Sequence, residues 1–264
     1  MTELKVQPPE VMARSQWLAA RKELLEQERE LTRIRDKVNT ARRKLPMVRI
    51  DKTYTFEGPA GTRTLVELFE GRLQLIVYHF MFGPEWDLPC RSCSAAMDEI
   101  GRGHLNHLRA RTTTFVAVSR APFPKIRSFR KRMGWIFPWY SSYETSFNYD
   151  FHVTLHDSVA PIVYNYRTPE EHKAAGTDYY INGTQPIELP GMSCFFRDGD
   201  EVYHTYSAYA RGLEIGGSDS LLDLTVLGRQ EEWEEPKGRF TGLGAQAGDP
   251  TIPYPDEYEF KPEE

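Results

Sequence analysis

Cys90 and Cys93, separated by two residues, are the side chains of this sequence best suited to chemistry. A thiolate is a strong nucleophile, and two thiols at this spacing either close reversibly into a disulfide or ligate a metal. The chain of 264 residues contains only one more cysteine, Cys194, so a structural disulfide framework is not expected in a reducing compartment. Cys194 lies in an apolar, strand-like segment and is expected to be an inert core residue.

The elements around the pair should activate it. An apolar segment at 73–82 predicts a buried strand, and the loop GPEWDLP then leads to a helix that opens at the cysteines. The free N–H groups and the positive dipole end of a helix favour a thiolate, and Arg91 adds positive charge beside it. Cys90 should therefore be exposed and attack, and Cys93, one turn inward, should resolve the mixed disulfide.

Two other interpretations of the pair are a zinc site and a buried structural thiol pair. Zinc would need two further ligands, for which His104 and His107 are the candidates, although their spacing is tighter than usual. One continuous helix is expected over about residues 94–109, and it would separate Cys93 from His104 by about 16 Å at roughly 1.5 Å per residue. Zinc is therefore disfavoured, and the two histidines are expected on a helix surface.

Three regions differ in pattern along the chain. Residues 1–47 contain a Pro- and Gly-free stretch of strong helix formers from about Ser15, which predicts one long helix. Residues 48–228 alternate strand-like and helix-like segments, which predicts α/β layers around a central sheet. Residues 229–264 hold four Lys/Arg, ten Asp/Glu and five prolines, which is typical of an acidic, Pro/Gly-rich tail. In the middle region we expect strands at 52–58, 73–82, 112–119 and 160–167, and helices at 64–69, 94–109 and 124–133. Residues 193–207 are expected to form a strand pair around a turn at Asp198-Gly199.

The long helix carries an apolar stripe of coiled-coil period. Leu24 and Leu31 belong to this stripe, and Gln27 interrupts it. Packing against the protein's own domain is favoured, and the other placement is a homodimer arm. In either case Leu24 and Leu31 should be buried. The stripe repeats every seven residues at Trp17, Leu24, Leu31, Val38 and Leu45.

Composition excludes several functional classes. A formal net charge of −5 argues against a nucleic-acid-binding protein, because such proteins usually carry a net positive charge. No apolar run approaches the roughly 20 residues that span a membrane, and the N-terminal residues lack the pattern of a signal peptide. We therefore expect a cytoplasmic protein that contacts neither membrane nor nucleic acid. The stretch from Arg120 to Arg132 has six basic residues and no acid, which predicts either a solvated helix face, the favoured interpretation, or an anion-binding rim.

The sequence resembles a bacterial thioredoxin-like family of unknown function whose members are described as predicted dithiol-disulfide oxidoreductases. The resemblance covers nearly all of residues 10–230. It implies a thioredoxin fold of the peroxiredoxin-like branch, with a central mixed sheet flanked by helices and with Cys90 and Cys93 at the redox position. The segments that carry it are QWLAARKELLEQE, LVELFEGRLQLIVYHFMFGPEW, CRSCS, FVAVSRAP, RMGWIFPWYSS, FNYDF and VYHTYSAYARGLE.

The function expected from residues and resemblance together is thiol-disulfide exchange on a protein or low-molecular-weight thiol substrate. No cofactor is required, because the two sulfurs carry the electrons. Peroxiredoxins place Pro and a hydroxyl residue seven and three positions before the attacking cysteine, where this chain has Gly83 and Asp87. Two alternatives to thiol-disulfide exchange are therefore less favoured. One is a divergent thiol peroxidase, and the other is a non-catalytic thioredoxin-fold binding or scaffold protein.

Overall fold

The computed structural model describes residues 5–6, 9–210, 240–241 and 254–257. The chain divides into two compact units. Most of the predicted tail at 229–264 lies outside the described residues. The first unit comprises Met1–Pro46 with Asp219–Gln246, and the second comprises Met47–Ser218 with Ala247–Glu264.

The first unit contains the predicted long helix, α1 (Arg14–Arg43), and a two-strand pair of β1 (Lys5–Val6) with β12 (Phe240–Thr241). The helix begins before Ser15, because the Gln16 side chain accepts the backbone N–H of Ala13 at 3.2 Å and so caps the first turn. Leu24 and Leu31 are 47% and 56% exposed. Within the described chain the apolar stripe is thus uncovered, and its packing against a second copy remains a prediction.

The second unit is built on an eight-stranded mixed sheet with the order β2-β11-β10-β5-β6-β7-β3-β4. Strands β5, β6 and β7 are parallel, and β10 and β11 form an antiparallel hairpin that pairs with β5 through β10. Gly199 in the hairpin turn has a φ of 57°, a left-handed conformation that glycine adopts without strain. The strands are β2 (Val48–Arg49), β3 (Thr55–Gly58), β4 (Gly61–Thr64), β5 (Gln74–His79), β6 (Thr113–Ser119), β7 (Trp139–Ser141), β10 (Gly191–Asp198) and β11 (Glu201–Tyr209).

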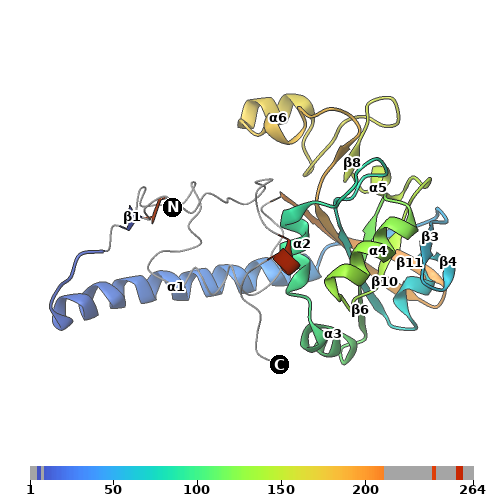
Figure 1. Ribbon diagram of the computed structural model, residues 1–264. Coiled ribbons are helices and arrows are strands. Elements are labelled where there is room, and N and C mark those ends of the chain that lie inside the picture. The colour runs from blue at the N-terminus through green and yellow to red at the C-terminus, as the bar shows by residue number, and fades with distance from the viewer. Residues whose placement is uncertain (1–4, 7–8, 211–239, 242–253, 258–264) are drawn as a thin grey trace. The chain divides into compact units, whose positions relative to one another are not determined.

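Helices cover both faces of this sheet (Figure 1). On one face, α2 (Arg91–Asp98), α3 (Arg102–Arg109) and α4 (Phe123–Met133) pack on Tyr78, Phe115 and Ala117. On the other face, η1 (Glu67–Phe69) and α5 (Phe147–Asp150) pack on Leu75 and Val77. A third apolar cluster includes residues of β8 (Thr154–Leu155), β9 (Ile187–Glu188) and η2 (Asp178–Tyr180). The helix α6 (Pro169–Ala175) contacts it through His172, which bonds to the Tyr164 carbonyl at 2.9 Å.

The strand order confirms the predicted fold class. A parallel pair joined through helices, followed by a hairpin that returns antiparallel beside the first strand, is the thioredoxin arrangement, here extended by strands at both edges. Three expected elements differ from the structure. The helix expected over 64–69 is only the short 3₁₀ helix η1, because Thr64 ends β4. The helix expected over 94–109 is two helices, because α2 ends at Asp98 and α3 begins at Arg102 with Gly101 as its N-cap. Residues 160–167 form no strand; they turn back on themselves through a bridge between Tyr164 and Arg167.

Candidate redox site

The cysteine pair lies where β5 passes through a loop into α2, as the sequence predicts. Cys90 is the N-cap residue of α2, and its sulfur accepts the backbone N–H of Cys93 at 3.4 Å. This sulfur takes the place of the side-chain oxygen that usually caps a helix. The Cys90 N–H donates to the Met81 carbonyl at 3.0 Å, and the Ser94 hydroxyl donates to the Cys90 carbonyl at 2.9 Å. The backbone on both sides of the sulfur is therefore fixed.

The two cysteines differ in exposure. Cys90 is half-buried, whereas Cys93 is 3% exposed within the core cluster below α2. Both thiols are reduced in the structure. Cys90 is therefore the more accessible sulfur of the pair.

The same geometry separates the two pKa values. The Cys93 thiol donates a hydrogen bond to the Cys90 sulfur, and with the backbone N–H groups of Cys93 and Ser92 it lowers the pKa of Cys90 to about 7, against the opposing effect of burial. The pKa of Cys93 is raised well above its ordinary value, by that hydrogen bond first and then by burial. Cys90 is thus partly a thiolate near neutral pH while Cys93 holds its proton.

Tyr78 on β5 is a member of this site that the sequence analysis missed. Its hydroxyl hydrogen-bonds to the Cys93 sulfur, as does the backbone N–H of Met81, and both bonds favour the Cys93 thiolate. Tyr78 is 2% exposed, and burial raises its own pKa well above the ordinary range. Strand alternation could have found it, because Tyr78 and Leu75 fall on opposite faces of a strand and the cysteine helix covers only one face.

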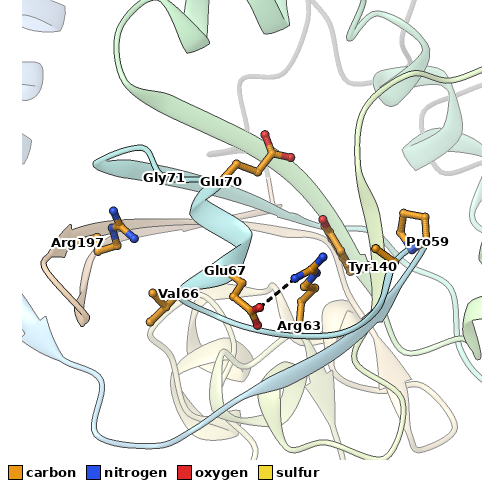
Figure 2. A pocket seen from close by; sticks show the side chains of 9 residues that line it. Pro59, Arg63, Val66, Glu67, Glu70, Gly71, Tyr140 and Arg197 are labelled. Carbon is orange, nitrogen blue, oxygen red and sulfur yellow. Dashed lines mark hydrogen bonds and ion pairs between the residues drawn. The ribbon is translucent and has the colours of Figure 1, made fainter.

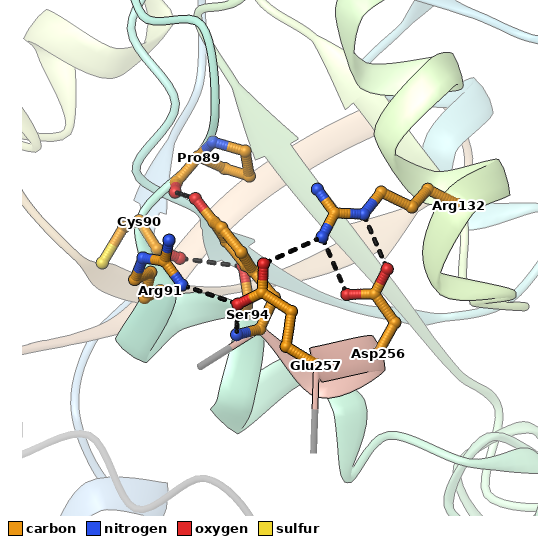
Figure 3. A network of polar contacts seen from close by, with 8 residues as sticks. Pro89, Cys90, Arg91, Ser94, Arg132, Asp256 and Glu257 are labelled. Carbon is orange, nitrogen blue, oxygen red and sulfur yellow. Dashed lines mark hydrogen bonds and ion pairs between the residues drawn. The ribbon is translucent and has the colours of Figure 1, made fainter. Parts of the chain in front are cut away.

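Arg91 does not act on Cys90 as the sequence suggested. Its guanidinium forms an ion pair with Glu257 at 2.9 Å and stacks 4.0 Å from the centre of the Tyr254 ring. The causes that lower the pKa of Cys90 are hydrogen bonds from Cys93 and Ser92, and Arg91 is not among them. Figure 3 shows the polar network that holds Arg91 next to the cysteine.

Four of the six basic residues between Arg120 and Arg132 are engaged by the protein itself. Arg120 forms an ion pair at 2.6 Å with Glu188, which is buried, and Lys125 donates to two carbonyls of the loop before Cys90. Arg130 donates to the Ile136 carbonyl, and Arg132 binds both oxygens of Asp256. Only Arg127 and Lys131 remain as exposed members with no ion pair among the described residues.

The remaining candidate residues of the sequence analysis form no metal site with the cysteine pair. Within the described ranges, no group of three or more His, Cys, Asp or Glu side chains could hold a metal ion. His104 and His107 lie on α3. Cys194 is half-buried in β10 rather than fully buried in the core, because it falls on the less buried of the strand's two faces.

A separate surface hollow lies at the other end of the sheet, and Figure 2 shows its lining. Its volume is about 490 Å³, and neither cysteine of the pair lines it. Arg63 and Glu67 form an ion pair at 3.0 Å across its wall, so its charges are partly neutralised within the protein. The hollow contains no nucleophile suited to covalent chemistry and does not extend the cysteine site.

This chain belongs to the family described as "Bacterial protein of unknown function (DUF899)", which matches residues 6–249. The match spans both units and includes the cysteine pair. No curated protein matches the sequence. The family thus agrees with the resemblance seen in the sequence, and it assigns no activity.

The solved structures that this chain resembles include peroxiredoxins. Peroxidoxin BcpB from Mycobacterium tuberculosis is 12% identical, with 62% of this chain and 84% of that chain covered and a TM-score of 0.36. A cysteine-to-serine mutant of Xanthomonas campestris peroxiredoxin Q is 11% identical, with 61% and 82% covered and a TM-score of 0.35. A yeast mitochondrial 1-Cys peroxiredoxin is 11% identical, with 67% and 73% covered and a TM-score of 0.38. Likenesses this low carry no argument about activity, so the fold assignment depends on the strand order above.

The described residues contain no helix that is long and apolar enough to cross a membrane. The helix that is long enough, α1, is amphipathic and charged along most of its length.

Proposed function

We propose that this protein is a thiol-disulfide oxidoreductase in which Cys90 attacks and Cys93 resolves. The observation that carries the proposal is the asymmetry of the pair. One sulfur caps a helix, is half-buried and has a pKa of about 7, and the other is buried beneath it and keeps its proton. This asymmetry is what a two-step exchange requires, because the attacking thiol should ionise near ambient pH.

The proposed reaction balances over two exchanges. The Cys90 thiolate attacks one sulfur of a substrate disulfide, forms a mixed disulfide and expels the first substrate thiolate. Cys93 then loses its proton, attacks the Cys90 sulfur and expels the second substrate thiolate. The substrate disulfide gains two electrons and is reduced to two thiols, and the protein is left with a Cys90–Cys93 disulfide. The reverse sequence oxidises a dithiol substrate.

Equilibration against a glutathione series tests the proposal directly. The purified protein is incubated at set ratios of reduced to oxidised glutathione, quenched with an alkylating agent and weighed by mass spectrometry. We expect a single two-electron transition in which both thiols of the pair disappear together, so that the oxidised protein carries two fewer alkyl groups than the reduced protein. Two free thiols across the whole series would contradict the proposal and favour a non-catalytic binding protein.

Two cysteine variants control this experiment. Cys93→Ser should accumulate a mixed disulfide with glutathione at Cys90, because the resolving step is removed. Cys194→Ser should leave the transition unchanged, since Cys194 lies on a different strand from the cysteine loop. A mixed disulfide at Cys194 would show that the wrong thiol was assigned.

Peroxide reduction is expected to be slower than disulfide reduction. Gly83 and Asp87 stand where a peroxidase needs Pro and a hydroxyl residue, and Asp87 is exposed. A stopped-flow comparison of hydrogen peroxide with a protein disulfide measures both rates on the same sample. Faster oxidation by peroxide that disappears in Cys90→Ser would reverse this order.

We further propose that α1 forms a homodimer through its apolar stripe. The exposed fractions of Leu24 and Leu31 support this, because apolar residues at seven-residue spacing are usually covered by a second helix. Replacing both residues with Glu should halve the mass measured by light scattering. A monomeric wild-type protein at micromolar concentration would contradict the dimer without affecting the redox proposal.

A further inference from the structure

A short segment near the C-terminus, Tyr254–Glu257, packs against the cysteine loop in the second unit. We call it the clamp. Tyr254 is 3% exposed, its hydroxyl donates to the Pro89 carbonyl at 2.8 Å, and its ring meets Phe129 of α4 with centroids 5.4 Å apart. A buried aromatic side chain with a satisfied hydroxyl is the mark of a specific contact.

Two ion pairs complete the attachment of the clamp. Asp256 accepts two hydrogen bonds from the Arg132 guanidinium, at 2.7 and 2.9 Å, in the bidentate geometry that makes Arg–carboxylate pairs strong. Glu257 pairs with Arg91 at 2.9 Å and also meets Arg132 at 3.4 Å. The clamp thus forms ion pairs with both α2 and α4 (Figure 3).

The clamp contacts the residues on both sides of the attacking cysteine. Tyr254 binds the carbonyl of Pro89, the residue before Cys90, and Glu257 binds the side chain of Arg91, the residue after it. We propose that the clamp is a positioning element of the redox site, which fixes the loop through Pro89 and restrains the reactivity of Cys90 by neutralising Arg91. This inference rests on the proposed function for its biological meaning, but its test does not.

The electrostatic reason is the difference between a free cation and an ion pair. The field of a paired guanidinium and carboxylate largely cancels at a neighbouring sulfur, whereas an unpaired guanidinium would stabilise the Cys90 thiolate. Among the residues that the structure describes, the other titratable groups that face Cys90 are Cys93 on its own helix, Tyr78 on β5 and Tyr254 of the clamp. Lys125 of α4 is bound to the loop carbonyls of Pro84 and Trp86. Arg91, the residue directly after Cys90, is therefore the cation that the clamp pairs with through Glu257.

The test measures the alkylation rate of Cys90 against pH in the full-length protein. Glu257→Gln removes the charge that neutralises Arg91 and keeps the shape of the side chain. The apparent pKa should fall, and the rate at pH 6 should rise about two- to fivefold, since more thiolate outweighs its lower intrinsic nucleophilicity. The gain should vanish in 1 M salt, where the screening length is about 3 Å.

A double-mutant cycle and a matched control make this result specific. In an Arg91→Met background, Glu257→Gln should change neither the pKa nor the rate, because no cation remains to be released. Glu85→Gln removes an equal charge from the exposed part of the cysteine loop and should leave the rate nearly unchanged. An equal gain in Glu85→Gln, or a gain that persists without Arg91, would overturn the proposal.

A variant that removes a different contact of the clamp, the hydrogen bond from Tyr254 to Pro89, tests whether the clamp fixes the loop. Tyr254→Phe deletes only the hydroxyl that binds Pro89, so it should keep the ring packing and loosen the loop without releasing Arg91. We expect faster hydrogen exchange at the Cys90 and Arg91 amides with little change in the pH profile. Unchanged exchange would show that the clamp does not fix the loop. A failure of the glutathione experiment would leave these measurements valid, since they need only an alkylating agent.

Discussion

Tyr78 and His79 are neighbours on β5 that serve buried polar networks on opposite faces of the sheet. Tyr78 lies in the core cluster with the cysteine pair and hydrogen-bonds to Cys93. His79 bonds to the Ser193 hydroxyl at 2.8 Å on the other face and stacks against the ring of Phe151, with centroids 5.9 Å apart. Both side chains are at most 2% exposed.

The network on the His79 face ends at His204 of β11, which is half-buried. Ser193 bonds to Ser207 and Ser207 to His204, each at 2.8 Å, so the chain of hydrogen bonds crosses three strands. Burial lowers the pKa of His79 to about 3, so the ring is neutral at physiological pH. The network on the Tyr78 face ends instead at Cys90, which is half-buried and sits on a helix N-terminus. The comparison teaches that burial shifts pKa values on both faces, and that the two networks differ in where they end: one at a histidine within a strand, the other at a thiol on a helix N-terminus.

Cys90→Ser should produce the largest effect on the reactive face. Removing the nucleophile should lower the rate of disulfide reduction at least about a thousandfold while the melting temperature stays close to that of the wild type. A coupled assay with an aromatic disulfide and thermal unfolding measure the two quantities. Substantial exchange activity in this variant would show that Cys90 is not the nucleophile and that the reaction takes place elsewhere than on the Tyr78 face.

Ser193→Ala should show the opposite behaviour, on the His79 face. It leaves the buried His79 ring without its hydroxyl partner, so the free energy of unfolding should fall by about 1–3 kcal/mol. Disulfide reduction should be unchanged. Urea denaturation measures the loss, and Ser128→Ala on exposed α4 surface is the control, expected to stay within about 0.5 kcal/mol. A loss of exchange activity without a loss of stability would mean that this network takes part in the chemistry.

Tyr78→Phe should give the smallest of these effects and the most specific. Without the hydroxyl, the Cys93 thiolate loses a hydrogen bond, so the pKa of Cys93 should rise further and the resolving step should slow roughly two- to tenfold. The first attack, by Cys90, should keep its rate. Rapid-quench detection of the mixed disulfide separates the two steps, and an equal slowing of both would contradict a role for Tyr78 at Cys93 alone.

Much of the redox unit follows from the sequence because its signals are local. Apolar strands, a loop with proline and a helix opening at Cys90 predict the βα junction, and Asp198-Gly199 predicts the hairpin turn. The break at Gly101 was missed, because a glycine inside a helical pattern does not by itself show where a helix ends. Residues 160–167 alternate like a strand, but their side chains pack in a separate cluster outside the sheet.

The parts of the site that the sequence did not predict depend on distant residues. Glu257 lies 166 positions from Arg91, and Asp256 lies 124 positions from Arg132. No sequence periodicity links such distant pairs. The sequence therefore predicts an acidic tail and a basic helix, but it does not predict that they form ion pairs with each other. The predicted role of Arg91 changed for this reason, since a charge acts according to its partner in the fold.

The central claim is that Cys90 is the activated thiol and Cys93 is the protected one. The most direct measurement is the rate of alkylation at each cysteine of the reduced protein across pH 5–10, resolved by peptide mass spectrometry. The account predicts that the rate at Cys90 rises to half its plateau near pH 7, following its pKa of about 7, and that Cys93 reacts far more slowly throughout. Equal rates at the two cysteines, or a Cys90 midpoint at the ordinary thiol value of about 8.5, would contradict it.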